Sequence, residues 1–363
     1  MDNLEEIRNR VDGVDAQMAS LFEQRMELVR EIVAYKTAHG LAIVDPSREQ
    51  EIIRRNASRV SDRDIREYYV NFQREVMHIS RDWQRRLSKG LRVAYSGVPG
   101  AFAYIAAMRL YPGSELVAQP DFETAYRACE EGEVDVAVLP FENSFAGEVS
   151  TVTDLMFSGT LYVNQVIEVE AEQNLLGLPG ADKARIRKVY SHPQALAQCT
   201  DYIHGKGLEA IGVSNTATAA KQVAEMNDPA RAAIGTAEAA ALYGLEIIEP
   251  RINSSRTNTT RFAAFSRMLR LDTENKRKMG KHFILMYTVK NEAGALAQTL
   301  NIIGAHNFNM CNLRSRPMKE LLWNYYFFVE LDGDVTTEEG SSLLQELSGL
   351  CDRLKLVGSF YTR

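Results

Sequence analysis

The chain has 363 residues and a formal net charge of −6, and 45% of its residues are hydrophobic. This length is too great for one small core and favours two or three domains. The negative net charge argues against a general nucleic-acid-binding protein, and no apolar run is long enough to cross a bilayer or to act as a secretory signal. The four cysteines lie far apart, without a CxxC pair. We therefore expect a cytoplasmic protein with no disulfide framework and no metal site.

Residues 1–88 are predicted to be helical throughout. Apolar residues recur at helical spacing between positions 4 and 33, with no interior proline. A His-Gly pair at 39–40 ends this helix, an Asp-Pro pair at 45–46 begins the second, and a third helix runs over about 62–87. Three long helices around a narrow seam make a poor core for one chain. We therefore expect a homodimer in which helices pack across subunits.

Two cations of the first helix share one face. Arg25 and Lys36 are 11 positions apart, which places them within roughly 20° of each other and about 16 Å apart along the axis. Their side chains can reach opposite ends of a small dianion. Arg8 lies about 25 Å from Arg25 on another face, so it can join the same site only from a partner's antiparallel helix. Any one of these side chains could instead be simply solvated, and that alternative stays open.

The polar residues of this segment, in chain order, resemble the α-helical chorismate mutase family. The matching residues are Arg8, Arg25, Lys36, Asp45, Arg48, Glu49, Ser80 and Gln84. The resemblance implies an intertwined dimer and the pericyclic rearrangement of chorismate to prephenate, which needs no acid, base or cofactor. It assigns the three arginines to the substrate carboxylates and the lysine and glutamine to the breaking ether oxygen. It assigns the two acidic residues to the substrate hydroxyl and its surroundings.

From position 91 strands alternate with helices, which predicts an α/β sheet whose ligands collect at the carboxyl ends of the strands. Four polar segments follow apolar strands or precede one: SGVPGAF, FENS, SHPQALAQC and TNTTRF. Each alone has a structural explanation, as a turn or a helix cap. Together we expect them to face one cleft, with Glu142, Ser191 and Thr260 opening onto the same crevice.

Over residues 91–267 these motifs resemble prephenate dehydratase. The resemblance implies two α/β lobes around a cleft, similar to periplasmic binding proteins, and the conversion of prephenate to phenylpyruvate. Thr260 then corresponds to the family's catalytic threonine, with Arg261 as fixed positive charge beside it and Glu142 as one candidate for a proton relay. Which group transfers the proton stays open. The residues expected to orient the substrate are Asn143, Ser191, Gln198 and Thr216.

Residues 268–281 read as a linker, and 282–363 follow the order βαββαβ of a ferredoxin-like fold. This last segment resembles the ACT regulatory domain, which implies feedback by phenylalanine. The expected effector-binding residues are Gly294, Ala295, Leu296, Ser315, Arg316 and Pro317. The family usually has an acidic residue where this chain has Arg314, which reverses a charge near the expected effector site. A module that serves only dimerisation is the alternative.

The sequence therefore predicts a cytoplasmic bifunctional enzyme of phenylalanine biosynthesis, at least a homodimer, with chorismate and prephenate as substrates and no cofactor, metal, nucleic acid or membrane partner. One alternative is a dehydratase whose helical segment serves only for assembly. Another is a non-catalytic ligand-sensing protein with the same two-lobed fold.

Overall fold

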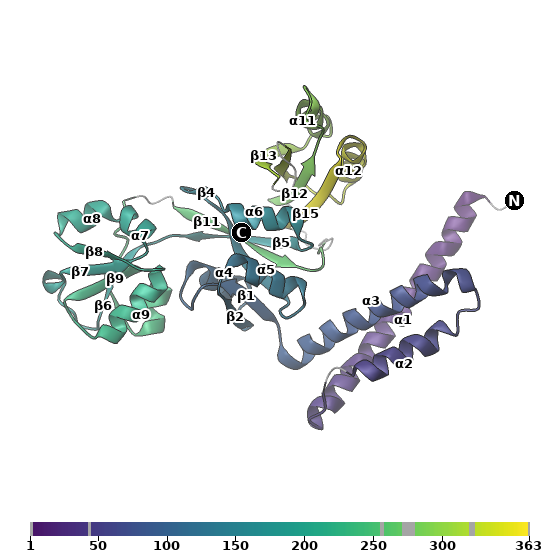
Figure 1. The fold of residues 1–363 in the computed structure, drawn as a ribbon, viewed down its shortest axis with the longest axis horizontal. Coiled ribbons are helices and arrows are strands. Elements are labelled where there is room, and N and C mark those ends of the chain that lie inside the picture. Colours follow the sequence, from purple (N-terminus) through teal and green to yellow (C-terminus); the bar gives the residue numbers. More distant parts are fainter. Residues whose placement is uncertain (1–2, 43–44, 255–257, 271–279, 319–323, 362–363) are drawn as a thin grey trace. The chain divides into compact units, whose positions relative to one another are not determined.

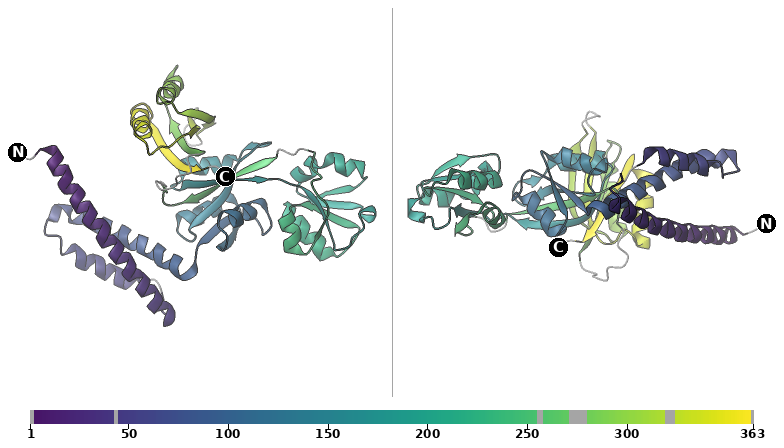
Figure 2. Two further views of the ribbon diagram at one scale, coloured as in Figure 1. Left: turned by 180° about the vertical axis from the view of Figure 1, so that it is seen from behind. Right: turned by 90° about the horizontal axis from the view of Figure 1, so that it is seen from below.

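The computed structural model describes residues 3–42, 45–254, 258–270, 280–318 and 324–361. They divide into two compact units, Met1–Arg92 and Val93–Arg363, whose elements are drawn in Figures 1 and 2. Most of the predicted linker, residues 271–279, lies outside the described residues. Among the described helices, none combines the length and the apolar character that crossing a membrane requires.

The first unit contains three helices, α1 (Leu4–Ala38), α2 (Pro46–Ala57) and α3 (Arg63–Lys89). Local capping explains where they begin and end. Asp45 accepts a hydrogen bond from the Arg48 backbone at 3.1 Å at the start of α2. Gly90, with φ of 74°, ends α3 in a conformation that favours glycine. The predicted helix starts are confirmed, and α3 runs two residues beyond its expected end.

The helical unit buries few apolar side chains. Among its described residues, the buried hydrophobic ones are Val29 and Val33 of α1 and Val76 and Met77 of α3. The large hydrophobic residues that stay exposed on α1 are Leu4, Ile7, Val11, Val14, Met18, Leu21, Phe22, Leu28, Ile32 and Tyr35. An apolar stripe of this kind is unusual on the surface of a monomer.

The second unit begins with an α/β lobe, which we call the first lobe. Its strands are β1 (Arg92–Ser96), β2 (Glu115–Gln119), β3 (Val136–Asn143), β4 (Gly147–Glu148), β5 (Tyr162–Glu170) and β11 (Thr259–Ser266). Its helices are α4 (Phe102–Leu110), α5 (Phe122–Glu130) and α6 (Ser150–Ser158). The late strand β11 inserts between β3 and β5, antiparallel to both. This insertion carries the segment at 259–262 alongside the end of β3, more than 100 positions earlier in the chain.

A second lobe is inserted between β5 and β11. Its sheet has the order β10-β6-β9-β7-β8. The strands are β6 (Asn174–Gly177), β7 (Lys188–Ser191), β8 (Glu209–Gly212), β9 (Arg231–Gly235) and β10 (Glu246–Glu249), and the helices are α7 (Pro193–Gln198), α8 (Thr200–Gly205), α9 (Thr216–Met226) and α10 (Ala237–Tyr243). A short 3-10 helix covers Lys183–Arg185. Two segments of chain therefore join the lobes (Figure 1), an arrangement shared with periplasmic binding proteins.

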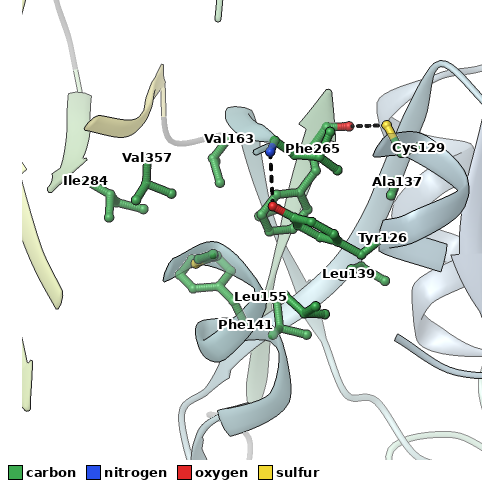
Figure 3. Close-up of a cluster of buried hydrophobic side chains, with 14 of the residues drawn as sticks. Tyr126, Cys129, Ala137, Leu139, Phe141, Leu155, Val163, Phe265, Ile284 and Val357 are labelled. Atoms are coloured by element: carbon green, nitrogen blue, oxygen red, sulfur yellow. Dashed lines mark hydrogen bonds between the residues drawn. The ribbon is translucent and has the colours of Figure 1, made fainter. Parts of the chain in front are cut away.

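The rest of the second unit is a C-terminal module of β12 (Lys281–Thr288), α11 (Ala295–Ala305), β13 (Asn309–Pro317), β14 (Tyr325–Asp332), α12 (Glu338–Leu350) and β15 (Arg353–Tyr361). One face of its sheet packs on α11 and α12, where Phe283 and Leu285 meet Leu343. The other face joins the core of the first lobe. Figure 3 shows Ile284 and Val357 in one cluster with Phe141 and other first-lobe residues.

The module and the first lobe also share one sheet. β15 pairs with β5 at Gly358 and Val163, so that the ten strands form a single sheet with the path β13-β14-β12-β15-β5-β11-β3-β1-β2 and β4 attached to β3. A side chain at Gly358 would collide with the Val163 backbone. This close contact explains why glycine occupies that position.

Candidate active sites

In the helical unit, the structure brings Arg25 and Ser80 together. A terminal nitrogen of Arg25 donates to the Ser80 hydroxyl, and the other lies 3.4 Å from the Met77 sulfur. Ser80 in turn donates to the Val76 carbonyl at 2.6 Å, which holds the hydroxyl in place. Partial burial lowers the pKa of the Arg25 guanidinium. Two predicted site residues from different helices are therefore in contact, and Ser80 holds the Arg25 cation in position.

The α2 residues of the predicted set play different local roles. Asp45 caps the helix, and hydrogen bonds from the Ser47 hydroxyl and the Arg48 backbone lower the pKa of this exposed carboxylate. The exposed Arg48 side chain pairs with Glu51 one turn along, at 2.7 Å. Glu49 accepts from Arg81 of α3 at 3.1 Å. This last pair fixes α2 on α3, and Arg81 was not among the predicted residues.

The remaining predicted residues of this unit lie on α1 and α3. Gln84 is half-buried one turn after Ser80, and its side-chain oxygen has no hydrogen-bond partner among the described residues. Lys36 is half-buried in the last turn of α1. Arg8 is exposed near the start of the same helix. A buried amide oxygen without a partner is costly, so Gln84 is suited to meeting a ligand.

In the second unit, a cavity of about 160 Å³ lies between the two lobes. Its lining comes from the first lobe (Ala101, Phe102, Asn143, Asn258, Thr260), from the crossing segment (Ala171, Gln173) and from the second lobe (His192, Gln194, Ala195, Gln198, Asn215, Thr216). Amides and hydroxyls dominate the polar part of this lining. Among the described residues that line it, none is Lys, Arg, Asp or Glu.

Thr260 and Asn143 form the centre of this cavity's polar wall. They are direct partners in the β3–β11 ladder. The Asn143 amide donates to the Thr260 hydroxyl oxygen at 2.9 Å and to Asn258 Oδ1 at 2.8 Å, and its own oxygen accepts from the backbone of Ala146 at 2.8 Å. Because Asn143 occupies an acceptor position of the Thr260 oxygen, the hydroxyl proton of Thr260 remains available to a ligand.

Glu142 and Arg261 are the neighbours of this pair, and their side chains contact the C-terminal module. Arg261 lies 2.9 Å from Glu142 and 2.7 Å from Glu330 of β14, and Glu142 also binds Arg314 of β13. Successive residues of a strand point to opposite faces. The expectation that Glu142 relays a proton to Thr260, and that Arg261 places charge beside it, is therefore not met by this geometry.

The predicted second-lobe residues also differ in whether they line the cavity. Ser191 is fully buried and donates to the Ile234 carbonyl at 2.6 Å, which ties β7 to β9, and it does not line the cavity. Gln198 and Thr216 do line it, and the Gln198 side-chain oxygen has no partner among the described residues. Of the three residues expected to share a crevice, only Thr260 reaches it; this prediction was wrong for Glu142 and Ser191.

Sequence reasoning missed Gln173 as a site residue. It lies in the short segment between β5 and β6, and only 2% of it is exposed. Its side-chain oxygen also has no partner among the described residues. No motif marks this glutamine. The available signal was its position in the three-residue segment between two strands, at the crossing between lobes.

The predicted effector residues occupy two elements of the module. Gly294 caps α11 with φ of 86°, and Ala295 and Leu296 begin that helix. Ser315, Arg316 and Pro317 end β13. The Arg316 guanidinium binds Glu148 and lies 3.0 Å from Asp154, both in the first lobe. The two cations of β13 thus face the first lobe, since Arg314 pairs with Glu142 in the same way.

Two family models match the chain: chorismate mutase type II over residues 7–85 and prephenate dehydratase over residues 93–269. A bifunctional chorismate mutase/prephenate dehydratase from Neisseria gonorrhoeae is 30% identical over 363 residues, covering 98% of this chain and 96% of that protein.

Among solved structures, a prephenate dehydratase from Arthrobacter aurescens in complex with L-Phe is 25% identical, with a TM-score of 0.67, over 75% of this chain and 90% of that one. A structure described as a novel type of quorum quenching acylase is 29% identical, with a TM-score of 0.68, over 75% of this chain and 98% of that one. With near-complete coverage by the Neisseria relative and a family model matched in each unit, the chain belongs to the family of bifunctional chorismate mutase/prephenate dehydratases.

Proposed function

We propose that the helical unit converts chorismate to prephenate and that the two lobes of the second unit convert prephenate to phenylpyruvate. Both activities belong to phenylalanine biosynthesis, and both family models match the chain in the corresponding order. The observation that carries the second assignment is the hydrogen bond from Asn143 to Thr260 at the wall of the interlobe cavity.

The first reaction moves no proton. It requires the dicarboxylate in its reactive conformer and stabilisation of charge on the breaking ether oxygen. Arg25, held by Ser80, supplies a positioned cation for a carboxylate. Lys36 and the side-chain NH2 group of Gln84 donate to the ether oxygen.

A second copy of the chain completes this site. The exposed apolar stripe of α1 needs a cover, and in a homodimer a partner helix supplies it. Arg8 of that copy then reaches the site, since on its own helix it lies about 25 Å from Arg25. Arg48 acts there with Arg8 on the carboxylates, after exchanging its exposed partner Glu51 for the substrate.

The second reaction breaks two bonds and needs one proton. Prephenate dianion takes up a proton and gives phenylpyruvate, carbon dioxide and water. The electron pair of the leaving carboxylate enters the ring as the ring C–O bond breaks. Thr260 donates a hydrogen bond to the departing oxygen, and Asn143 holds the threonine oxygen from behind. Gln198 and Thr216 orient the substrate from the second lobe.

The neutral lining of the cavity suits this chemistry. A strong ion pair with the carboxylate that leaves would stabilise the ground state more than the transition state. Amides, hydroxyls and the backbone N–H groups at the start of α4, whose N-cap Ala101 has no side-chain cap, can bind carboxylates without a fixed charge. The described lining therefore supports decarboxylation better than a cationic pocket would.

Thr260→Ala tests the assignment. With chorismate as the only substrate, the variant is expected to form prephenate at the wild-type rate and to accumulate it, with dehydration reduced about a thousandfold. Both steps are followed by ultraviolet absorbance. Thr259→Ala, the matched control, removes a hydroxyl that does not line the cavity and is expected to retain both activities. Wild-type dehydration by Thr260→Ala would refute the assignment.

We further propose that residues 282–363 form a ferredoxin-like ACT domain through which phenylalanine inhibits dehydration in the cytoplasm. The strand and helix order of the module supports this fold. The L-Phe in the structure from Arthrobacter aurescens supports the effector. Gly294, Ala295 and Leu296 at the start of α11 are its expected contacts, because the N-terminus of a helix presents backbone N–H groups to a carboxylate.

A further inference from the structure

We infer that Glu330, a carboxylate of the C-terminal module, is a positioning residue for dehydration that acts through Arg261 on Thr260. The inference rests on the proposed role of Thr260. It makes the module a structural part of the dehydratase site in addition to any role in binding an effector.

Glu330 of the module binds Arg261 of β11 through both of its carboxylate oxygens. Its two oxygens lie 2.7 Å and 2.8 Å from the two terminal nitrogens of Arg261, a bidentate pair. The Glu330 side chain is 2% exposed and that of Arg261 17%. Such forked arginine–carboxylate pairs restrict direction as well as distance. Glu330 therefore fixes the Arg261 side chain against the face of the sheet opposite the cavity.

The local sheet explains why β11 needs this support. The β3–β11 ladder is regular from Phe265 back to Phe262, and its register shifts between Phe262 and Arg261. Beyond the shift only two pairs remain, Arg261 with Glu142 and Thr260 with Asn143. On the other side of β11 the ladder with β5 runs without a break from Thr259 to Ala264 and holds the Thr260 backbone. The irregularity therefore concerns the β3 side alone, where side-chain contacts have more influence on how Thr260 meets Asn143 than they would in a regular ladder.

A chain of ionic contacts links this strand end to the module. Glu142 bridges Arg261 and Arg314, and Asn312 of β13 lies 3.3 Å from Glu142. Burial by itself lowers the pKa of Arg261, but the hydrogen bonds and charges of Glu330 and then Glu142 raise it overall, so the guanidinium stays charged. Thr260 is therefore next in sequence to Arg261, and Asn143 to Glu142, and the module contacts both of these charged neighbours.

Glu330→Gln in the full-length enzyme tests the inference. It keeps the shape of the side chain and removes the charge that holds Arg261. The expected result is a tenfold lower kcat for dehydration, less than a twofold change in KM for prephenate, and an unchanged mutase rate. Asp154→Asn is the matched control, because Asp154 of α6 binds Arg316 and Tyr326 across the same contact between module and lobe.

A double-mutant cycle separates positioning from general stability. If Glu330 acts by placing the Thr260 hydroxyl, Glu330→Gln has no further effect on the residual dehydration rate of Thr260→Ala. An equal loss in both backgrounds, or an equal loss in Asp154→Asn, would overturn the inference. If Glu330→Gln does not fold, Glu330→Asp is measured instead, because it keeps the charge but shortens the side chain. It must lower kcat for dehydration by less than the tenfold expected for Glu330→Gln, and an unchanged kcat would overturn the inference. Full dehydration by Thr260→Ala would instead refute the proposed function itself.

Discussion

The two sites proposed for related dicarboxylates, in the helical unit and in the interlobe cavity, present opposite kinds of side chain. The helical site presents a held arginine, a half-buried lysine and further cations on α1 and α2. The described lining of the cavity has mainly amides and hydroxyls as polar groups, and no Lys, Arg, Asp or Glu. The reactions explain the difference. The rearrangement keeps both carboxylates, so cations that bind them do not oppose the reaction. Dehydration releases one carboxylate as carbon dioxide, and a cation bound to that group would stabilise the ground state more than the transition state.

The two sites also differ in how completely one chain builds them. The cavity is lined from both lobes of a single chain. In contrast, the helical unit buries little of its apolar surface and leaves Arg8 far from Arg25 along the same helix. In the dimer proposed above, the thin helical layer completes its site with a second copy, while an inserted lobe provides the second wall of a cleft within one chain.

The largest expected effect comes from Arg25→Ala. We expect the mutase rate to fall about a thousandfold, since a positioned cation at a carboxylate is lost, while dehydration of added prephenate is unchanged. Both rates are measured on one preparation. Arg30→Ala is the control, because Arg30 lies on the same helix and pairs with exposed Glu27. A parallel loss of both activities in Arg25→Ala would mean misfolding or one shared site.

Asn143→Asp tests the neutrality of the cavity. The substitution preserves shape but replaces a donor to Thr260 with a carboxylate. We expect kcat/KM for prephenate to fall about a hundredfold, from repulsion of the substrate and loss of the hydrogen bonds that the amide donates to Thr260 and Asn258. Asn164→Asp makes the same change on β5, outside the cavity lining, and is expected to stay within twofold of wild type. A near-wild-type Asn143→Asp enzyme would contradict the contrast drawn between the two sites.

The smallest effect concerns a cation that belongs to neither site. Lys355 of β15 donates to the Met156 carbonyl at the end of α6, at 2.5 Å. Burial, with nearby Arg353, lowers its pKa to about 8 from an ordinary value of 10.5. Between these values the unfolded chain binds more protons than the folded one, so this lysine makes the free energy of unfolding rise with pH.

The measurement is urea unfolding of wild type and Lys355→Met at pH 8 and pH 10, followed by circular dichroism. We expect the free energy of unfolding of wild type to gain about 1–2 kcal/mol relative to the variant between these two pH values. Lys206→Met, which removes an exposed lysine of the second lobe, is the control and should show no such gain. A difference that is constant with pH would contradict the lowered pKa.

Much of the fold follows from local patterns. The Asp-Pro pair at 45–46, the glycine after α3 and the helical spacing of apolar residues mark the ends of helices correctly, because caps and periodicity act over a few residues. The alternation of strands and helices likewise predicts an α/β lobe. That β11 inserts between β3 and β5 is a pairing across 89 positions or more, and no local signal in these strands specifies it.

The sequence alone determined which residue types this protein has available for its two reactions: cations on helices in the first unit, and amides and hydroxyls after apolar strands in the second. Only the tertiary structure decided which of them meet. Neighbours such as Glu142 and Asn143, or Thr260 and Arg261, look equivalent in a motif. The pleat of the strand sends one member of each pair toward the cavity and the other toward the C-terminal module.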